Sequence, residues 1–415
     1  MAVRDVLHAW VCGEYVGRFE RDFDLDKPRF VRDPNSSAEL SLSMRSDRKI
    51  EAGAPQNFLD ALIPERQSAK DSIRRVTHAK STATWDLLEA IGGDLPGGVV
   101  LHPDLNGPTR EEAFSRVASE ALVAARIADI KEGGSGFDED YGDAPRFSLA
   151  GAQGKFAFAQ IGEQFFWSDS ASPSTHIVKP ESKVHAGLEL IETATMRLAQ
   201  LSGIAAPDTE RRHFAGQSAF QVVRFDRAID ADGIPHRIHA EDFTQALNHG
   251  GDKYLVSTDE ITAMLREATG DDELGYDFYR QYAFNSMIGN ADAHGKNYSI
   301  LFTAGGLQLA PIYDAIPIGM FADYAQNLAM PVDGMTNYLT IGPAEWIASA
   351  QESGLDVDRV LTIVAEVAAG IHEHLAETLG EIGHPRVTDA ALDDIRTAAD
   401  RHTGKLALPG SGAVI

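Results

Sequence analysis

Three polar side chains in the C-terminal half are spaced so that they could act together. Asp292 and Asn297 lie in one polar loop, which follows an apolar run ending at Ile288. Two short strand-like runs come next, joined by a glycine pair, and the second run ends at Asp314. Two strands with a glycine turn between them predict a β-hairpin. This hairpin would hold Asp314 beside the loop that carries Asp292 and Asn297.

The same arrangement serves phosphoryl transfer in protein kinases. There the first Asp orients the attacking hydroxyl and accepts its proton, while the Asn and the second Asp bind Mg2+ through oxygen atoms. A turn without function would favour the same residue types, because Asp and Asn are common in turns. An apolar helix on one side and a hairpin on the other provide the rigid support that a catalytic loop needs. The pattern therefore favours a catalytic loop over a simple turn.

A loop of small residues, Ser148–Lys155, is the second feature that could take part in chemistry. It runs into an alternating strand predicted over Phe156–Ile161. A glycine loop ahead of a strand can bring its backbone amides close to a phosphate. The loop is not a Walker A sequence, because Leu149 and Phe156 stand where that motif requires Gly and Ser or Thr. A plain hairpin turn is the alternative interpretation.

Lys179 stands near the end of a predicted strand that begins at Thr175. An amphipathic helix follows from Gly187 to Ser202, with Glu192 beside its apolar face. In kinases a strand lysine paired with a helical glutamate positions the ATP phosphates. Glu192 is the best candidate for that ion pair. An isolated surface lysine is the alternative.

The composition limits the class of protein. With 415 residues, 43% of them hydrophobic, the chain has room for two or three globular domains. No apolar run approaches the roughly 20 residues of a membrane span, and no signal sequence opens the chain. The single cysteine, Cys12, indicates a reducing cytoplasm without an intramolecular disulfide. A net charge of −25 disfavours direct DNA binding by this chain alone.

The order of predicted elements is mostly sheet and then mostly helix, which indicates an α+β fold with two lobes. Strands are also predicted over 6–11, 15–19, 29–32 and 220–227. Helices are predicted over 57–64, 85–91, 110–131, from Glu241 onward, over 258–269 and 276–288, and through most of the tail from 343. A Gly- and Asp-rich stretch marks a boundary. The predicted segments are an N-terminal domain (1–131), this boundary (132–147), the nucleotide-binding part of a small lobe (148–227) and a helical catalytic lobe (228–415).

Two other patterns have simpler explanations. The run His372-Glu373-His374 resembles a zinc-protease helix, but Ala376 stands where that motif needs its second His. A solvated helix face is therefore favoured. Asp292 and His294 could bind the metal of a phosphohydrolase, yet no second His-Asp pair with ligand-like spacing accompanies them.

Five motifs taken together resemble the HipA family of serine/threonine kinase toxins. They are Ser148–Lys155, Thr175–Lys179, Arg224–Arg227, Asn290–Asn297 and Pro311–Asp314. The N-terminal runs 40–43, 57–64 and 96–101 also resemble the N-terminal domain of that family. The resemblance covers most of the chain and implies a two-lobed, protein-kinase-like fold with a β-rich N-terminal domain.

The resemblance implies a role for each matching residue. Asp292 would be the catalytic base, Asn297 and Asp314 the Mg2+ ligands, and Ser148 an autophosphorylation site. The ATP-binding residues would be Ala150, Gly151, Ala152, Gln153, Gly154, Lys155, Lys179, Val223, Arg224, Phe225, His294, Gly295, Lys296, Asn297, Tyr313 and Asp314. Gly154 and Val223 replace residues that are acidic in many members, and Ala315 replaces the Gly that follows the metal-binding Asp of ordinary protein kinases. Gly154 would loosen the phosphate loop.

The resemblance also implies partners. The chain would be one half of a type II toxin–antitoxin pair, with ATP and Mg2+ as cofactors. A small helix-turn-helix antitoxin of the HipB type would neutralise it and would provide the contact with operator DNA. The phosphorylated target would be a translation factor such as an aminoacyl-tRNA synthetase, whose modification would halt translation and give persistence.

Two further classes of function stay open on the sequence. A small-molecule phosphotransferase would use the same Asp, Asn and Asp, and a catalytically silent scaffold would act as a co-repressor with a DNA-binding partner. The intact motifs speak against the silent scaffold. Incubation with labelled ATP separates the three, because the label would end on protein, on a metabolite alone, or nowhere.

Overall fold

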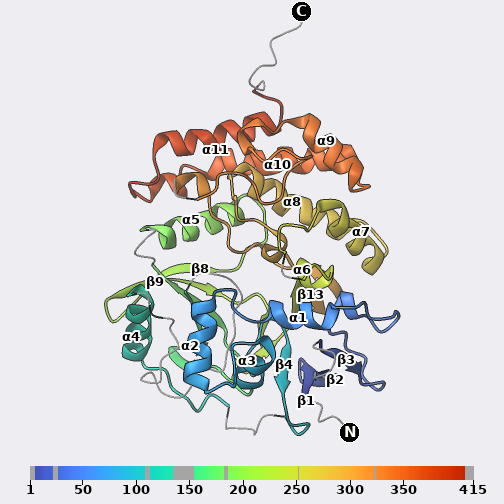
Figure 1. The fold of residues 1–415 in the computed structure, drawn as a ribbon. Helices are drawn as coiled ribbons and strands as arrows, with labels where there is room; N and C mark the ends of the chain where they lie inside the picture. The colour runs from blue at the N-terminus through green and yellow to red at the C-terminus, as the bar shows by residue number, and fades with distance from the viewer. Residues whose placement is uncertain are drawn as a thin grey trace, which may run out of the picture. The chain divides into compact units, whose positions relative to one another are not determined.

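The computed structural model describes residues 5–21, 27–107, 113–132, 134, 154–181, 186–250, 252–321 and 324–406. The chain forms two compact units, each assembled from separate stretches (Figure 1). The first unit comprises Met1–Val184, Glu210–Gly251 and Leu301–Gly305. The second comprises His185–Thr209, Asp252–Ile300 and Gly306–Ile415.

The first unit opens with a four-stranded antiparallel sheet of order β3-β2-β1-β4. Its strands are β1 (Asp5–Val11), β2 (Glu14–Arg21), β3 (Arg29–Arg32) and β4 (Val99–His102). Leu7 is in register with Phe19 of β2, and Ala9 with Leu101 of β4. Because side chains alternate along a strand, these pairs give the sheet one apolar face.

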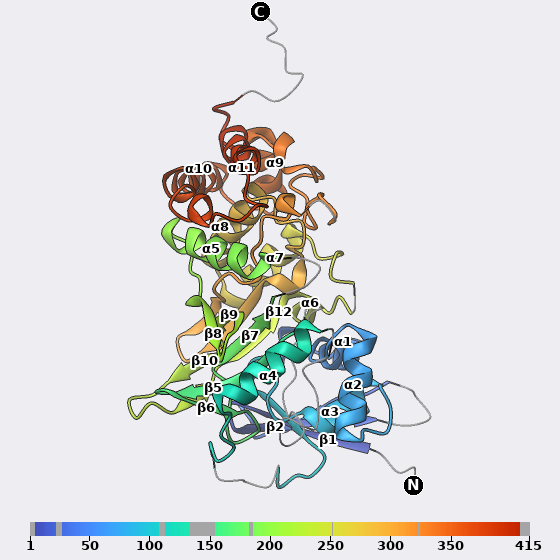
Figure 2. The ribbon, with the colours of Figure 1, turned by 90° about the vertical axis from the view of Figure 1, so that its left-hand side faces the viewer.

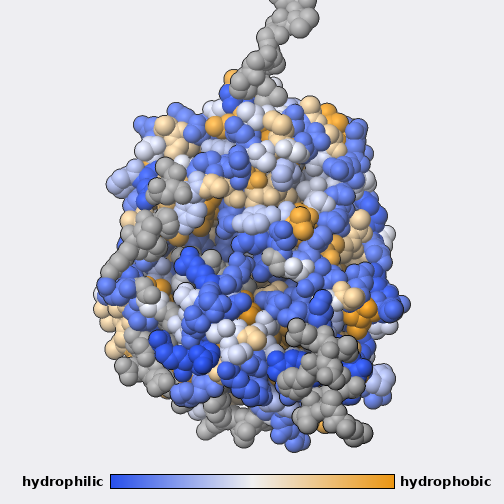
Figure 3. Space-filling model, viewed as in Figure 1, coloured by the Kyte–Doolittle hydropathy of each residue, from blue (hydrophilic) through white to orange (hydrophobic). Residues whose placement is uncertain are grey.

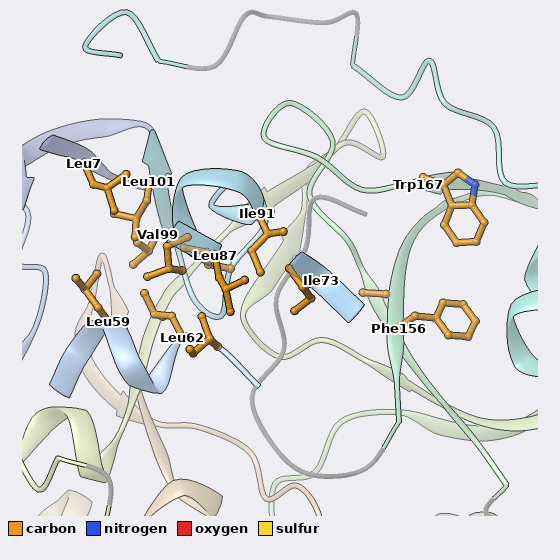
Figure 4. Close-up of a cluster of buried hydrophobic side chains, with 14 of the residues drawn as sticks. Leu7, Leu59, Leu62, Ile73, Leu87, Ile91, Val99, Leu101, Phe156 and Trp167 are labelled. Atoms are coloured by element: carbon orange, nitrogen blue, oxygen red, sulfur yellow. The ribbon is translucent and has the colours of Figure 1, made fainter. Parts of the chain in front are cut away.

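Helices cover that apolar face and close the core of this part of the unit (Figure 4). They are α1 (Ala54–Ala61), α2 (Gln67–Thr77) and α3 (Thr84–Ile91). The side chains drawn between sheet and helices are Leu7, Val99 and Leu101 from the strands, Leu59 and Leu62 from α1 and its C-cap, and Leu87 and Ile91 from α3. Burying one such side chain fully stabilises the fold by about 1.5–3 kcal/mol.

A second antiparallel sheet in this unit has five strands in the order β6-β5-β7-β9-β8. They are β5 (Phe156–Ile161), β6 (Gln164–Trp167), β7 (His176–Pro180), β8 (Thr209–Phe214) and β9 (Gln217–Val223). Strand β7 is central, with β5 and β9 antiparallel to it on either side. Helix α4 (Glu120–Lys131) packs against β7 and β9 (Figure 2).

The start of α4 differs from the helix predicted over 110–131. The Oγ of Ser119 accepts the N–H of Leu122 and caps the helix, so α4 begins at Glu120. Val117 instead forms a β-bridge with Phe166. The helix prediction was therefore wrong over 113–119, and residues 110–112 lie outside the described residues.

Further elements of the first unit follow β9. They are β10 (Arg227–Ile229), β11 (Pro235–Arg237), β12 (His239–Asp242) and α6 (Phe243–Ala246). The side chain of Asp242 accepts the N–H groups of Thr244 and Gln245 in a capping box. This cap sets the start of α6. The helix predicted from Glu241 onward was therefore wrong at 241–242, which lie in β12, and in the described residues beyond Ala246, where α6 ends.

The second unit is mainly helical. Its helices are α5 (Leu188–Leu201), α7 (Thr258–Thr269), α8 (Glu273–Met287), α9 (Pro343–Glu352), α10 (Val357–His374) and α11 (Asp389–His402). Helix α8 packs against α7, α10 and α11, and its Phe278, Tyr279 and Tyr282 are almost fully buried. The Tyr282 ring packs edge-on against Trp346 of α9. Predicted helices over 258–269 and in the tail from 343 are confirmed.

Hydrophilic residues cover most of the face drawn in Figure 3. Such a surface agrees with the net charge of −25. None of the helices in the described ranges combines the length and apolar character that crossing a membrane requires.

Glu241 is a buried carboxyl in the first unit. It is 2% exposed, and its Oε1 accepts the N–H of Leu42 at 2.8 Å. Burial raises the pKa of Glu241 to about 8. Between about pH 5 and 8 the native state therefore holds a proton that the unfolded chain has already released, so stability falls as pH rises through this window. The slope reaches about 1.4 kcal/mol per pH unit.

We expect Glu241→Gln to remove this pH dependence, because the amide keeps an acceptor oxygen but does not titrate. Thermal unfolding at pH 5 and at pH 8 gives the Tm difference between the variant and wild type. This difference should be more favourable to the variant at pH 8 than at pH 5. The exposed Glu163→Gln variant is the matched control and should follow wild type at both pH values. A Tm difference between Glu241→Gln and wild type that is equal at both pH values would contradict the raised pKa.

Candidate active site

The loop that contains Asp292 follows the C-terminus of the buried helix α8. The helix ends at Met287, Gly289 adopts a φ of +66°, and the N–H of Asn290 donates to the carbonyl of Asn285 at 2.9 Å. This is a glycine C-cap that turns the chain sharply out of the helix. A Cβ at position 289 would lie 2.9 Å from the ring of Tyr338. Both the conformation and the close approach therefore require glycine.

The side chain of Asn290 joins two parts of the predicted site. Its Nδ2 donates to Oδ1 of Asn285 at 2.9 Å and to the carbonyl of Asp314 at 3.3 Å. Asn285 in turn donates to the hydroxyl of Tyr298 at 3.1 Å. Asn285, Asn290 and Tyr298 are all buried. Asn290, at the start of the loop, is thus hydrogen-bonded to the main chain of Asp314.

Asn290 was not among the predicted site residues. The signal that could have identified it is a polar amide directly after a strongly apolar helix, since a buried amide must find hydrogen-bond partners.

Asp292 combines a fixed main chain with an open side chain. Its N–H donates to Oδ1 of Asn290 at 3.3 Å, and its carbonyl accepts the N–H of His294 at 2.9 Å. The carboxylate is 63% exposed, and its Oδ1 lies 3.6 Å from Nε2 of the buried His294. A carboxylate held in this way can meet a hydroxyl that arrives from solvent.

The hairpin after the loop is the one that the sequence predicts. Strands β13 (Ser299–Thr303) and β14 (Gly306–Leu309) are paired, and the N–H of Ala310 donates to the carbonyl of Ser299 at 2.8 Å. Strand β14 ends five residues earlier than predicted, before Asp314 rather than at it. Gln281 of α8 donates to the carbonyl of Ala310 at 2.7 Å, which fixes the chain beyond the strand.

Tyr313 forms a second link between the loop and the Asp314 segment. Its hydroxyl donates to the carbonyl of Lys296 at 2.7 Å and lies 2.6 Å from Oγ of Ser299. Lys296 belongs to the 3-10 turn Gly295–Asn297, in which the N–H of Asn297 donates to the carbonyl of His294 at 2.8 Å. Asn290 and Tyr313 thus hold the loop and the Asp314 segment side by side, which confirms the predicted proximity.

Asn297 and Asp314 fit a hard metal ion. Asn297 is 5% exposed, and no hydrogen-bond donor among the described residues reaches its buried Oδ1. An unsatisfied buried acceptor costs about 1–3 kcal/mol, and an oxygen-seeking cation such as Mg2+ would satisfy it. Asp314 adopts a φ of +53°, in the left-handed region that Asp tolerates better than most residues.

The described part of the chain offers no further metal ligands for the phosphohydrolase alternative. Within those residues no group of three or more His, Cys, Asp or Glu could hold a metal ion. The His372-Glu373-His374 run lies on α10, where His372 Nε2 is 3.0 Å from Asp400 Oδ1 and His374 Nδ1 is 2.6 Å from Glu377 Oε1. These contacts agree with the predicted helix face.

Lys179 lies on the central strand β7 of the first unit. It is buried, and its Nζ is 5.2 Å from the ring centroid of Phe220 on β9. It is therefore not the isolated surface lysine of the alternative interpretation. Glu192 is buried on α5 of the second unit, and its ion pair with Lys179 stays a prediction.

Gly154 and Lys155 directly precede β5, whose bounds match the predicted strand. Ser148 and residues 150–153 lie outside the described residues. A Cβ at Gly154 would lie 2.7 Å from Cγ2 of Ile130 on α4. A side chain at position 154 would therefore require Ile130 to move, which gives a local packing reason for the glycine.

Of the predicted hinge residues, Val223 ends β9, and Arg224 and Phe225 follow it. Val223 is exposed, Phe225 is partly buried, and the N–H of Arg224 donates to the carbonyl of Thr175 at 2.8 Å. The guanidinium of Arg224 is buried and donates to both oxygens of Asp226, at 2.9 and 2.6 Å. A nucleotide contact of Arg224 would therefore come from its main chain.

Arg224 and Asp226 belong to a buried charge network of the first unit. Arg227 donates to Asp94 at 2.9 Å, and the N–H of Gly97 donates to Asp226 at 2.7 Å. Burial alone would raise the pKa of Asp226, but the neighbouring Arg224 and Arg227 lower it far below its usual range. The network ties the chain after β9 to the turn before β4.

Comparison with known proteins matches both halves of the chain. The HipA N-terminal domain family matches residues 7–102, and the HipA-like C-terminal domain family matches residues 147–375. The serine/threonine-protein kinase toxin HipA of Shewanella oneidensis is 30% identical over 347 residues, which is 78% of this chain and 76% of that protein. The protein Y4mE of Sinorhizobium fredii is 28% identical over 412 residues, which is 95% of this chain and 96% of that one.

A solved structure shows the same fold. It is the complex of HipA and HipB from Shewanella oneidensis with operator DNA, whose toxin chain has a TM-score of 0.80 and 26% identity with this chain. The match covers 96% of this chain and 97% of that one. The predicted α+β, kinase-like fold is confirmed.

We expect Asn290→Ala to destabilise the second unit by about 1–3 kcal/mol, because buried partners in Asn285 and Asp314 would lose their donor. Thermal unfolding measures the loss as a lower Tm. Asn106→Ala, at an exposed asparagine of the first unit, is the control and should change stability by less than about 0.5 kcal/mol. Equal Tm values for the two variants would show that the Asn290 bonds do not support the loop.

Proposed function

Because this chain belongs to the HipA family, we propose that it is an ATP- and Mg2+-dependent serine/threonine protein kinase and the toxin of a toxin–antitoxin pair. The observation that carries the proposal is the loop in which an exposed Asp292 carboxylate stands five residues from Asn297, whose buried Oδ1 accepts no hydrogen bond from the described residues. Phosphoryl transfer in kinases uses a base that accepts the hydroxyl proton and side-chain oxygens that bind Mg2+. The Asp292 carboxylate and the Asn297 amide oxygen are groups of these two kinds.

Asp292 acts as the base in this proposal. Its carboxylate accepts the proton of a serine or threonine hydroxyl while the hydroxyl oxygen forms a bond to the γ-phosphorus of ATP. The bond between that phosphorus and the bridging oxygen breaks, and ADP leaves. The hydrogen bonds of Asp292 to Asn290 and His294 fix its main chain, so the carboxylate needs little reordering as the hydroxyl arrives.

We propose the nucleotide-binding roles residue by residue. Asn297 and Asp314 would hold Mg2+, which neutralises charge on the phosphates when bound. Lys179, packed on Phe220, offers a positive charge on a rigid strand. Residues 150–155 would cover the phosphates, Val223 to Phe225 would meet the adenine, and His294 to Lys296 with Tyr313 would complete the site.

The partners follow from the same family. The Shewanella oneidensis relative was solved with HipB and operator DNA. We propose a HipB-like helix-turn-helix antitoxin for this chain, with the antitoxin carrying the DNA contact that a net charge of −25 disfavours here. A cytoplasmic aminoacyl-tRNA synthetase is the proposed target, and Ser148 the proposed site of autophosphorylation.

We expect Asp292→Asn to lower phosphoryl transfer by about 10²- to 10⁴-fold, because loss of a positioned base has this effect. Transfer of labelled phosphate from ATP measures it, with mass spectrometry to find phosphate on Ser148 and on cellular proteins. Growth arrest on induced expression should disappear in parallel. The exposed Asp358→Asn variant on α10 should behave as wild type, and wild-type arrest by Asp292→Asn would refute the assignment of the base.

We expect Asn297→Ala to keep the Tm of the ligand-free protein, because no hydrogen-bond donor among the described residues reaches the oxygen that it removes. The variant should lack the stabilisation that ATP with Mg2+ gives wild type, about 2.7 kcal/mol at a ligand concentration 100 times Kd. Thermal shift with ATP alone, without Mg2+, is the control. An undiminished Mg2+-dependent shift would place the metal elsewhere.

A further inference from the structure

A short exposed segment of the second unit is attached to the candidate catalytic loop. It consists of Lys253, Tyr254 and Leu255, and we call it the docking corner. Tyr254 is 57% exposed and Leu255 is 62% exposed, although both carry large apolar groups. Single exposed apolar residues are common, but two in succession beside a catalytic loop are a candidate contact surface.

The corner has a fixed shape. Oδ1 of Asp252 accepts the N–H of Tyr254 at 3.2 Å, and the carbonyl of Asp252 accepts the N–H of Leu255 at 3.2 Å. Nζ of Lys253 lies 5.5 Å from the centroid of the Tyr254 ring. An Asx turn of this kind holds the exposed side chains with little loss of entropy on binding.

Two contacts join the corner to the catalytic loop. The carbonyl of Lys253 accepts the N–H of Gly295 at 3.1 Å. The ring of Tyr254 stands edge-on to the ring of His294, with centroids 5.5 Å apart and an interplanar angle of 86°. Since His294 Nε2 is 3.6 Å from the Asp292 carboxylate, the corner is one side chain away from the proposed base.

We propose that Tyr254 and Leu255 form a docking surface for an extended segment of the protein substrate and contact an apolar side chain near its phosphorylated serine or threonine. The proposal rests on the kinase function above. When a substrate serine or threonine places its hydroxyl at Asp292, the residues next to it in the substrate lie near the docking corner. An extended chain advances about 3.3 Å per residue, so a side chain a few residues away reaches the corner.

The exposure of the corner favours a polypeptide as its occupant. Small metabolites are usually bound in enclosed pockets that bury most of their surface. Two exposed apolar side chains on a fixed turn instead suit one apolar residue of a longer chain, which supplies the rest of its binding energy elsewhere.

Leu255→Ser is the sharpest test. It keeps the main-chain bond of residue 255 to Asp252, and it leaves the contact between Tyr254 and His294 in place. Leu105→Ser is the matched control, because Leu105 is 58% exposed and lies in the first unit. The full-length wild type and both variants are assayed with labelled ATP on a positional-scanning library of serine-centred peptides.

The wild type should prefer a large apolar residue at one or two positions beside the serine. Leu255→Ser should lose that preference, with KM for the preferred peptide raised about tenfold, since one apolar contact discriminates at about this level. Its kcat and its KM for ATP should stay within about twofold of wild type, because the contact binds substrate without taking part in chemistry. Leu105→Ser should keep the preference.

The outcomes separate this proposal from the kinase proposal. An apolar preference that persists in Leu255→Ser, or peptide phosphorylation by wild type without any preference, overturns the docking corner and leaves the kinase standing. Phosphate on the kinase itself but on no peptide also overturns it, because an extended segment should suffice. Absence of transfer to both the kinase and the peptides counts against the kinase function.

Discussion

The hydrogen bonds of Asn290 are the constraint on which the candidate site depends. This one buried amide bonds to Asn285 of α8, to the main chain of Asp314 and to the N–H of Asp292. A neutral hydrogen bond contributes only about 0.5–1.5 kcal/mol net, but three bonds from one side chain also fix relative position. The proposed base and a proposed metal ligand are far apart in sequence, and Asn290 gives them a common reference in the core of the second unit.

Buried charge plays the corresponding part in the first unit. Arg224, Arg227, Asp94 and Asp226 are all buried, and each is paired within the network. Removing one partner would leave an uncompensated charge, which costs about 3–5 kcal/mol. The network thus joins the N-terminal part of the chain to the end of β9 in one arrangement. Arg224 contributes to this framework with its guanidinium, so its side chain is not available to read a nucleotide.

Local pattern predicted those elements whose limits are set by neighbouring residues. Strand β5 alternates and is preceded by glycine, and its bounds matched the prediction. Helix α4 was predicted too long because Ser119 caps it and Val117 pairs with a strand that lies distant in sequence. The hairpin and its place beside the loop followed from spacing. The bonds of Asn290 and the pairing of Arg227 with Asp94 did not, because such partners are set only by the tertiary fold.

The left-handed backbone of Asp314 restricts which residues this position accepts. Most side chains lose about 1–2 kcal/mol in that conformation, while Asn and Asp tolerate it through local hydrogen bonding. An alanine there would combine backbone strain with the loss of the carboxylate, whereas asparagine would change the charge alone. Glycine would relieve the backbone but supply no ligand. Aspartate tolerates the conformation and carries the carboxylate that the proposed Mg2+ site would use, so conformational preference and the proposed metal chemistry favour the same amino acid.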